Sequence, residues 1–136
     1  MDYLSILGLR LKMLKLSDYE GPRCHGTKLI TNTIVDLCIE KHIKYELEVP
    51  IDSYRQVKTL RRGIIDILIT TENMQYAVEI DSSNKKWSLE KLKYMANRGC
   101  ESVWVRWCYP VKIELPSHVH LIDITNSDKL KRKRGI

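Results

Sequence analysis

Residues 64–69 read Ile-Ile-Asp-Ile-Leu-Ile, and residues 76–81 read Tyr-Ala-Val-Glu-Ile-Asp. The two apolar, largely β-branched runs are separated by residues 70–75, which are mostly polar. This pattern predicts two strands joined by a short turn. Each run also contains an acid at a position where an apolar residue is expected. The sequence therefore predicts a hairpin that buries carboxylates, around which the other elements of the chain are arranged.

Carboxylates inside an apolar sheet are costly, because they lose their hydration unless they are paired, hydrogen-bonded or bound to a cation. Glu79 and Asp81 are two residues apart, so both point to one face of their strand. Asp66 can lie across from them on the neighbouring strand. Three negative charges so close together predict a divalent metal site. The alternative is that Asp66 and Asp81 sit at strand ends and that Glu79 pairs with a lysine.

Length and charge divide the chain into one domain, residues 1–127, and a basic tail, residues 128–136. The 136 residues are 43% hydrophobic and 29% charged, as expected for one soluble globular domain. Much of the net charge of +6 comes from the tail, which we expect to be disordered. Such a run attracts phosphate backbones. The tail residues with this expected role are Lys131, Arg132, Lys133 and Arg134.

The compartment and the cysteines are also open to prediction. The sequence has no apolar run of membrane-spanning length and no small-residue cleavage site near its start, which predicts an intracellular protein without a membrane partner, in the cytoplasm or in a eukaryotic nucleus. Four cysteines without a C-x-x-C pair are then expected to be free thiols. Cys38 and His42, with Cys24 and His25 upstream, are an alternative zinc set, although their spacing fits no common zinc pattern.

Several elements are expected before the hairpin. Residues 1–16 fit a helix better than a strand, and residues 18–26 predict a loop. Thr27 is the expected N-cap of a helix that reaches about His42. Residues 45–49 then predict a strand that ends at Pro50, and residues 52–60 predict a polar connection.

After the hairpin, residues 82–84 offer helix caps for a helical segment over residues 87–96, which Gly99 closes. Residues 103–107 predict a strand, and residues 119–124 a last extended segment. From the second helix on, the expected order is helix, three strands, helix, strand. This order predicts an α/β sandwich with a mixed sheet.

With these motifs in this order, residues 27–107 resemble the PD-(D/E)XK nuclease superfamily, which has the restriction-endonuclease-like fold. That family has an α-β-β-β-α-β core with a mixed β-sheet flanked by helices. Its first metal-binding acid lies in the second core strand after a basic or glycine-containing lead, and residues 61–66, Arg-Arg-Gly-Ile-Ile-Asp, match it. Its second acid lies in the third strand, which residues 76–79, Tyr-Ala-Val-Glu, match.

The chain departs from the family at two places. Asp81 stands where most members carry a catalytic lysine, so Glu79-Ile80-Asp81 gives E-x-D in place of E-x-K. Relocation of that lysine into the following helix is a known variation, and the candidates here are Lys85, Lys86 and Lys91. The alternative for each is a solvated helix face. The first helix often carries a glutamate near its start, whereas residues 27–32 contain no acid.

The resemblance implies a metal-dependent endonuclease that hydrolyses phosphodiester bonds, with DNA as the expected substrate. It implies that Asp66, Glu79 and the main-chain carbonyl of Ile80 hold Mg²⁺ or Mn²⁺, hard cations that oxygen ligands suit. Asp81 is either a further ligand or a group that orients water. A lysine nearby would neutralise developing charge or help to deprotonate the water.

Arg61 and Arg62 precede the first acid and are expected to contact phosphates that flank the scissile bond, the alternative being an ordinary basic loop. A homodimer is a further expectation, since small single-domain members often pair to cut two strands. Two rival interpretations remain. One is a catalytically inactive nuclease-fold protein that binds nucleic acid or a protein partner. The other is an accessory protein whose basic tail is the working part.

Overall fold

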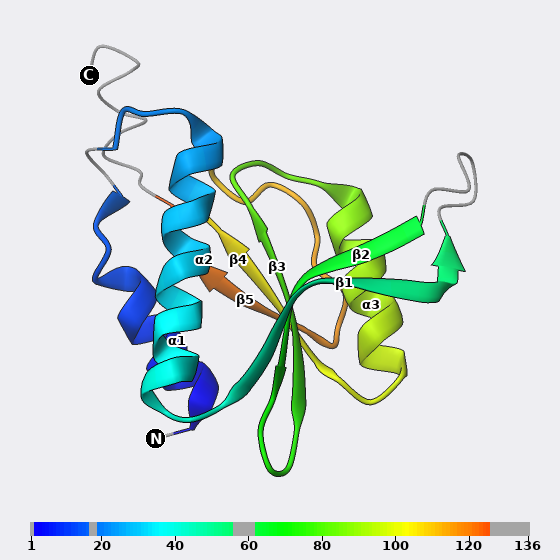
Figure 1. Ribbon diagram of the computed structural model, residues 1–136. Helices are drawn as coiled ribbons and strands as arrows, with labels where there is room; N and C mark the ends of the chain where they lie inside the picture. Colours follow the sequence, from blue (N-terminus) through cyan, green and yellow to red (C-terminus); the bar gives the residue numbers. More distant parts are fainter. Residues whose placement is uncertain (1, 17–18, 56–61, 126–136) are drawn as a thin grey trace.

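The computed structural model describes residues 2–16, 19–55 and 62–125, with the main chain alone at 52–55. Within these residues, five strands form one mixed sheet in the order β1-β2-β3-β4-β5, and three helices flank it (Figure 1). The mixed α/β architecture predicted from the sequence is thus confirmed. The elements are α1 (Tyr3–Lys12), α2 (Arg23–Glu40), β1 (Lys44–Arg55), β2 (Arg62–Thr70), β3 (Gln75–Asp81), α3 (Lys86–Asn97), β4 (Glu101–Arg106) and β5 (Val119–Asp123).

The pairing of neighbouring strands changes from antiparallel to parallel at β3. β1, β2 and β3 are antiparallel neighbours, whereas β4 lies parallel to β3 and β5 lies parallel to β4. The predicted hairpin is confirmed: between β2 and β3, Thr71 N donates to Met74 O at 2.8 Å, and Met74 N donates to Thr71 Oγ1 at 3.1 Å. The α3 helix then makes the crossover that two parallel strands require.

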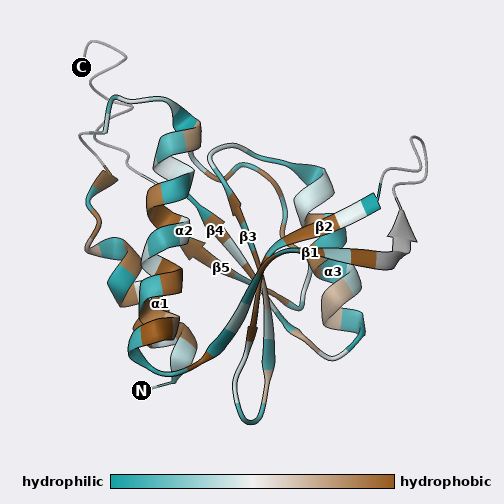
Figure 2. Ribbon diagram, viewed as in Figure 1, coloured by the Kyte–Doolittle hydropathy of each residue, from teal (hydrophilic) through white to brown (hydrophobic). Residues whose placement is uncertain are grey.

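Each face of the sheet has its own apolar core. On one face α1 and α2 pack against β3, whose Val78 and Ile80 are buried there. On the other face α3 packs with Ala77 of β3 and Trp104 of β4. Figure 2 shows the corresponding apolar stretches along the strands. Because strand side chains alternate, Glu79 lies on the α3 face with Ala77.

The start of α2 differs from the prediction. The helix begins at Arg23 after Pro22, so Thr27 lies inside it and the predicted loop over residues 18–26 is too long. Gly26 lies within the helix, and the Trp107 ring packs directly on it: an added Cβ would lie 2.2 Å from a ring carbon. This close contact, rather than a turn, explains the glycine. The first helix was predicted, and α1 confirms it.

The end of β1 also differs. The strand runs through Pro50 to Arg55, so the predicted end at Pro50 is wrong, as is the start of the polar connection. In the described sheet β1 is an edge strand, where the missing N–H of a proline is tolerated. Residues 56–61 lie outside the described part of the chain.

The caps predicted for α3 are not used as caps. Lys85 is the N-cap, and α3 begins at Lys86. Ser82 and Asn84 instead contact the loop after β4. The end of α3 agrees with the prediction, since Gly99 follows it with φ +96°, and β4 and β5 lie where strands were expected. Among the described helices, none has the length and apolar character needed to cross a membrane.

Candidate active site

The site lies where β2 and β3 separate. The two strands pair from Thr70 and Gln75 as far as Ile67 and Val78, where their pairing stops. β2 continues alongside β1 beyond this point. Asp66 and Glu79 are the next residues on the two strands, so both acids stand at the fork between them.

The two carboxylates take over hydrogen bonds at the fork. Asp66 N donates to Glu79 Oε2 at 2.8 Å, and Ile80 N donates to Asp66 Oδ2 at 2.9 Å. Each acid thus satisfies a main-chain N–H on the opposite strand. The hydrogen bonds fix the position of both side chains, and the structure brings these two predicted residues together.

A lysine from α3 completes the cluster. Lys91 Nζ forms an ion pair with Glu79 Oε1 and donates to Ile64 O at 2.8 Å. The side chains of Lys91 and Glu79 are only 9% and 2% exposed, so the pair is almost entirely shielded from water. Lys91 belongs to the buried face of α3 together with Ser88 and Leu92, which lie three residues before it and one after it. Helical spacing therefore carries this lysine to the sheet.

Burial makes the charge on these acids costly. It raises the pKa of Glu79 to about 8, and the neighbouring Asp66 charge adds to the shift against the opposing effect of Lys91. Burial also raises the pKa of Asp66, although the hydrogen bond from Ile80 N opposes this. A cation between two such carboxylates would relieve their desolvation and repulsion. Two carboxylates are a donor set that Mg²⁺ uses in proteins, so the residues present fit that ion.

Asp81 does not join the two acids. Its Oδ2 accepts a hydrogen bond from Trp104 Nε1 at 2.8 Å, and its Oδ1 lies 3.7 Å from Lys85 Nζ. A buried indole N–H needs an acceptor, and Trp104 on the neighbouring strand finds it here. In the described ranges there is no group of three His, Cys, Asp or Glu that could hold a metal ion. The predicted three-carboxylate cluster is therefore reduced to a pair, and the Cys24–Cys38 region forms no such group.

The other predicted residues are placed as follows. Lys85 is mostly exposed beside Asp81, and Lys86 is exposed at the start of α3, so Lys91 is the one candidate lysine found at the acids in the described structure. Ile80 presents its main chain to the site while its side chain packs under α1 and α2. Arg62 is exposed at the start of β2. The residues that lie outside the described ranges are Arg61, Lys131, Arg132, Lys133 and Arg134.

Sequence reasoning missed Arg106. This residue of β4 is fully buried, and its Nε donates to Asp81 O at 3.1 Å. Its other nitrogens donate to Asn84 Oδ1 and to Tyr109 O. The signal was present, because Arg106 interrupts an apolar strand in the way that Asp66 and Glu79 do. Its partners Asn84 and Tyr109 lie on two loops, and the alternation of residues along the strand does not predict them.

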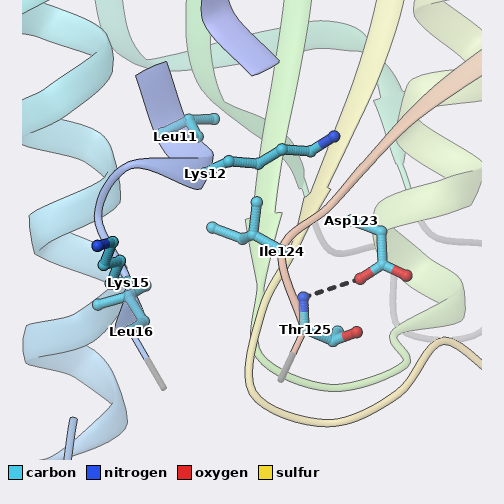
Figure 3. Close-up of a pocket in the computed structure, with 7 residues that line it drawn as sticks. All are labelled: Leu11, Lys12, Lys15, Leu16, Asp123, Ile124 and Thr125. Atoms are coloured by element: carbon cyan, nitrogen blue, oxygen red, sulfur yellow. Dashed lines mark hydrogen bonds between the residues drawn. The ribbon is translucent and has the colours of Figure 1, made fainter. Parts of the chain in front are cut away.

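A separate hollow lies at the end of α1. This pocket of about 260 Å³ is shown in Figure 3. Its residues come from the end of α1, the end of β5 and the segments that follow them: Leu11, Lys12, Lys15, Leu16, Asp123, Ile124 and Thr125. Asp123 Oδ1 accepts a hydrogen bond from Thr125 N at 2.9 Å. The pocket includes neither Asp66 nor Glu79, which we call the acid pair.

Comparison with known proteins gives little. No protein-family model matches the chain. A comparison with curated proteins gives no match either. Among solved structures, one that is similar is the crystal structure of a protein of unknown function, AF1548, with 10% sequence identity to this chain and a TM-score of 0.37. The match covers 65% of this chain and 53% of the other, so this chain spans about half the length of that protein.

Proposed function

We propose that the protein is a divalent-metal-dependent nuclease of the PD-(D/E)XK, restriction-endonuclease-like type that hydrolyses phosphodiester bonds in DNA. The observation that supports this most is the meeting of Asp66, Glu79 and Lys91 at the fork between β2 and β3. Phosphodiester hydrolysis needs oxygen ligands for a cation and a positive group near the phosphate. The cluster offers both in one shielded place.

Each residue has a proposed role. Asp66 and Glu79 hold Mg²⁺ or Mn²⁺, with the main-chain carbonyl of Ile80 as a further ligand. When bound, the ion supplies a water of lowered pKa and positive charge at the phosphate. Lys91 stabilises negative charge on the reacting phosphate, the role that the resemblance gives to a lysine in the following helix. Asp81 accepts a hydrogen bond from Trp104 and lies beside Lys85, and we assign it no role as a metal ligand.

The order of elements supports the same proposal. From α2 to β4 the chain runs helix, three strands, helix, strand. This is the order of the superfamily core that the sequence resembles, with both acids on its second and third strands. A homodimer that cuts two strands stays a prediction, which sedimentation of the purified protein would test.

The test is DNA cleavage by the purified chain, with supercoiled plasmid and branched DNA as substrates, in Mg²⁺, Mn²⁺ or EDTA. We expect cleavage only with a divalent ion and a loss of about 100-fold or more in Asp66→Asn and in Glu79→Gln. Asp36→Asn is the matched control, because Asp36 is an exposed acid on α2, and it should cut like the wild type. Unchanged activity in both site variants, or cleavage in EDTA, would contradict the proposal.

A second candidate has its own support. Glu79 Oε1 is already paired with Lys91, and Oε2 already accepts from Asp66 N, so the cluster is neutralised in part without any ion. Such a neutralised cluster would be sufficient in a nuclease-fold protein that binds nucleic acid or a protein partner without cutting. It predicts no cleavage in either metal and DNA binding that Asp66→Asn leaves unchanged.

A further inference from the structure

A surface beside the acid pair is not used by the proposed chemistry. It lies at the carboxyl ends of β3 and β4, where the loop after β3 meets the loop after β4, and the latter meets the start of α2 (Figure 1). Exposed side chains from these three segments form it. We call this surface the basic platform, and it consists of Arg23, Asn84, Lys85, Tyr109 and Lys112.

The platform is built on Arg106. This guanidinium is fully buried and donates to Asp81 O at 3.1 Å, to Asn84 Oδ1 and to Tyr109 O at 2.9 Å. One side chain thus ties the loop after β3 to the loop after β4. Because three of its nitrogens have internal acceptors, Arg106 supports the surface from beneath and does not itself face a ligand.

Asn84 makes the connection between the loops continuous. Its Oδ1 also accepts from Lys112 N at 3.2 Å, and its Nδ2 donates to Pro110 O at 3.3 Å. Tyr109 N donates to Ser82 O at 3.2 Å. The positions of Tyr109 and Lys112 are therefore set by the loop that follows the Glu79 strand.

The start of α2 is held against the segment that follows β4. Trp107 Nε1 donates to Thr27 Oγ1 at 3.2 Å, and the Trp107 ring packs on Gly26. Arg23, one turn earlier, places its guanidinium 5.7 Å from the centroid of the Tyr109 ring. An aromatic residue that is 37% exposed thus stands among cations on a well-supported surface.

The charges at the platform are nearly all positive. Arg23, Lys85 and Lys112 are exposed, whereas Asp81, the acid in contact with Lys85, is only 7% exposed and is bonded to Trp104. Aromatic rings on which bases stack, set among cations that follow the phosphates, are the means by which proteins hold single-stranded nucleic acid. In a duplex, by contrast, most bases are already stacked and paired.

We propose that the basic platform binds an unpaired segment of the DNA substrate, with a base stacked on Tyr109 and adjacent phosphates at Arg23, Lys85 and Lys112. This inference rests on the proposed function and names its substrate class, DNA with a single-stranded stretch next to the cleaved bond. The platform adjoins the acids because Asp81, whose main chain Arg106 holds, ends the strand that carries Glu79.

The test is fluorescence anisotropy in EDTA, where no metal-dependent cleavage occurs. The probes are a blunt duplex and the same duplex with a single-stranded tail of about eight nucleotides. The wild type should bind the tailed duplex more tightly. Tyr109→Leu should weaken tailed binding about tenfold and leave blunt binding unchanged, because the stacking of one base is lost. Arg23→Gln and Lys112→Gln should each lower the salt dependence of log K by about 0.7.

The chain offers a matched control pair on α3. Arg98 lies 5.5 Å from the Tyr94 ring centroid, much as Arg23 lies over Tyr109. Tyr94→Leu and Arg98→Gln should therefore keep the preference for the tailed duplex. Far-UV circular dichroism verifies the fold of every variant, and Arg23→Gln on the exposed surface of α2 serves if Tyr109→Leu does not fold.

Each outcome decides between the two proposals. Equal binding of blunt and tailed duplex by the wild type overturns the platform, as does wild-type affinity of Arg23→Gln and Tyr109→Leu for the tailed duplex. Tail binding that depends on Tyr109 in a protein that never cuts supports the platform and contradicts the nuclease. Cleavage that depends on Asp66, with no effect of Tyr109→Leu on tailed binding, supports the nuclease and contradicts the platform.

Discussion

Lys91 is a buried cation on a helix face that otherwise packs against the sheet. Lysine is seldom buried unless it is paired, and a buried ion pair is often no more stabilising than apolar side chains of similar size. Stability alone therefore gives little reason for a lysine at this position. Its contacts with Glu79 and with Ile64 O place the ammonium at the fork, where we propose that it has a chemical role.

Lys91→Met tests that role. We expect cleavage to fall by about 100-fold or more, because the positive group at the phosphate is lost. The free energy of unfolding should fall as well, because methionine leaves the buried Glu79 carboxyl without its cationic partner and Ile64 O without its donor. Single-turnover cleavage and urea unfolding measure the two effects. Lys93→Met, at an exposed position of the same helix, is the control, and equal cleavage by both variants would refute the role.

Glu79 predicts how stability depends on pH. Its pKa is raised from an ordinary value near 4.5 to about 8, so between these values the folded protein binds more protons than the unfolded chain. The free energy of unfolding therefore falls as pH rises from about 5 to about 8. Thermal unfolding in EDTA should show this decline, and Glu79→Gln should flatten it. Added Mg²⁺ should raise the melting temperature most at the upper end. If the melting temperature falls equally with pH in the wild type and in Glu79→Gln, the raised pKa of Glu79 is not the cause.

The site could be predicted from sequence only where a charged residue interrupts an apolar run. That rule located Asp66 and Glu79, and the structure places them together. Applied to Asp81 it gave a third member of the cluster, but the acceptor needed by the Trp104 indole, one strand away, decides where that carboxylate goes. The same rule points to Arg106, yet its partners come from loops that no periodic pattern describes.

Among the elements, α2 depends on a contact that is remote in sequence. Local sequence places Gly26 in a loop, because a glycine near a Gly-Pro pair favours a turn. The Trp107 ring on the residue after β4 occupies the space that a side chain would need. A contact that is remote in sequence therefore explains this glycine within the helix, and the edge position of β1 permits its passage through Pro50.

Gly26→Ala tests this packing. We expect a loss of about 1–3 kcal/mol in the free energy of unfolding, because the Trp107 ring must move. Gly8→Ala is the matched control: Gly8 lies within α1, and an added Cβ would meet nothing within 4 Å. It should stabilise the protein by about 0.5–1 kcal/mol. Urea unfolding measures both changes, and a Gly26→Ala variant as stable as Gly8→Ala would disprove the role of the contact.

The basic tail, residues 128–136, and the pair formed by Asp66 and Glu79 predict separable functions. Deletion of residues 128–136 should weaken DNA binding and lower its salt dependence, because several cations are removed. Single-turnover cleavage at saturating DNA should persist. Binding at several salt concentrations and cleavage of the same probe measure the two effects. If the deletion abolishes function while Asp66→Asn retains it, the tail is the working part and the acid pair is not.

We propose above that Asp66 and Glu79 form a site for a divalent cation. Calorimetric titration with Mn²⁺ tests it without any assumption about the substrate. We predict Mn²⁺ binding to the wild type and to Asp81→Asn, whose carboxylate is held by Trp104, and its loss in Asp66→Asn and in Glu79→Gln. Absence of Mn²⁺ binding by the wild type, or binding by the Asp66 and Glu79 variants equal to that of the wild type, would contradict a cation site at these two acids.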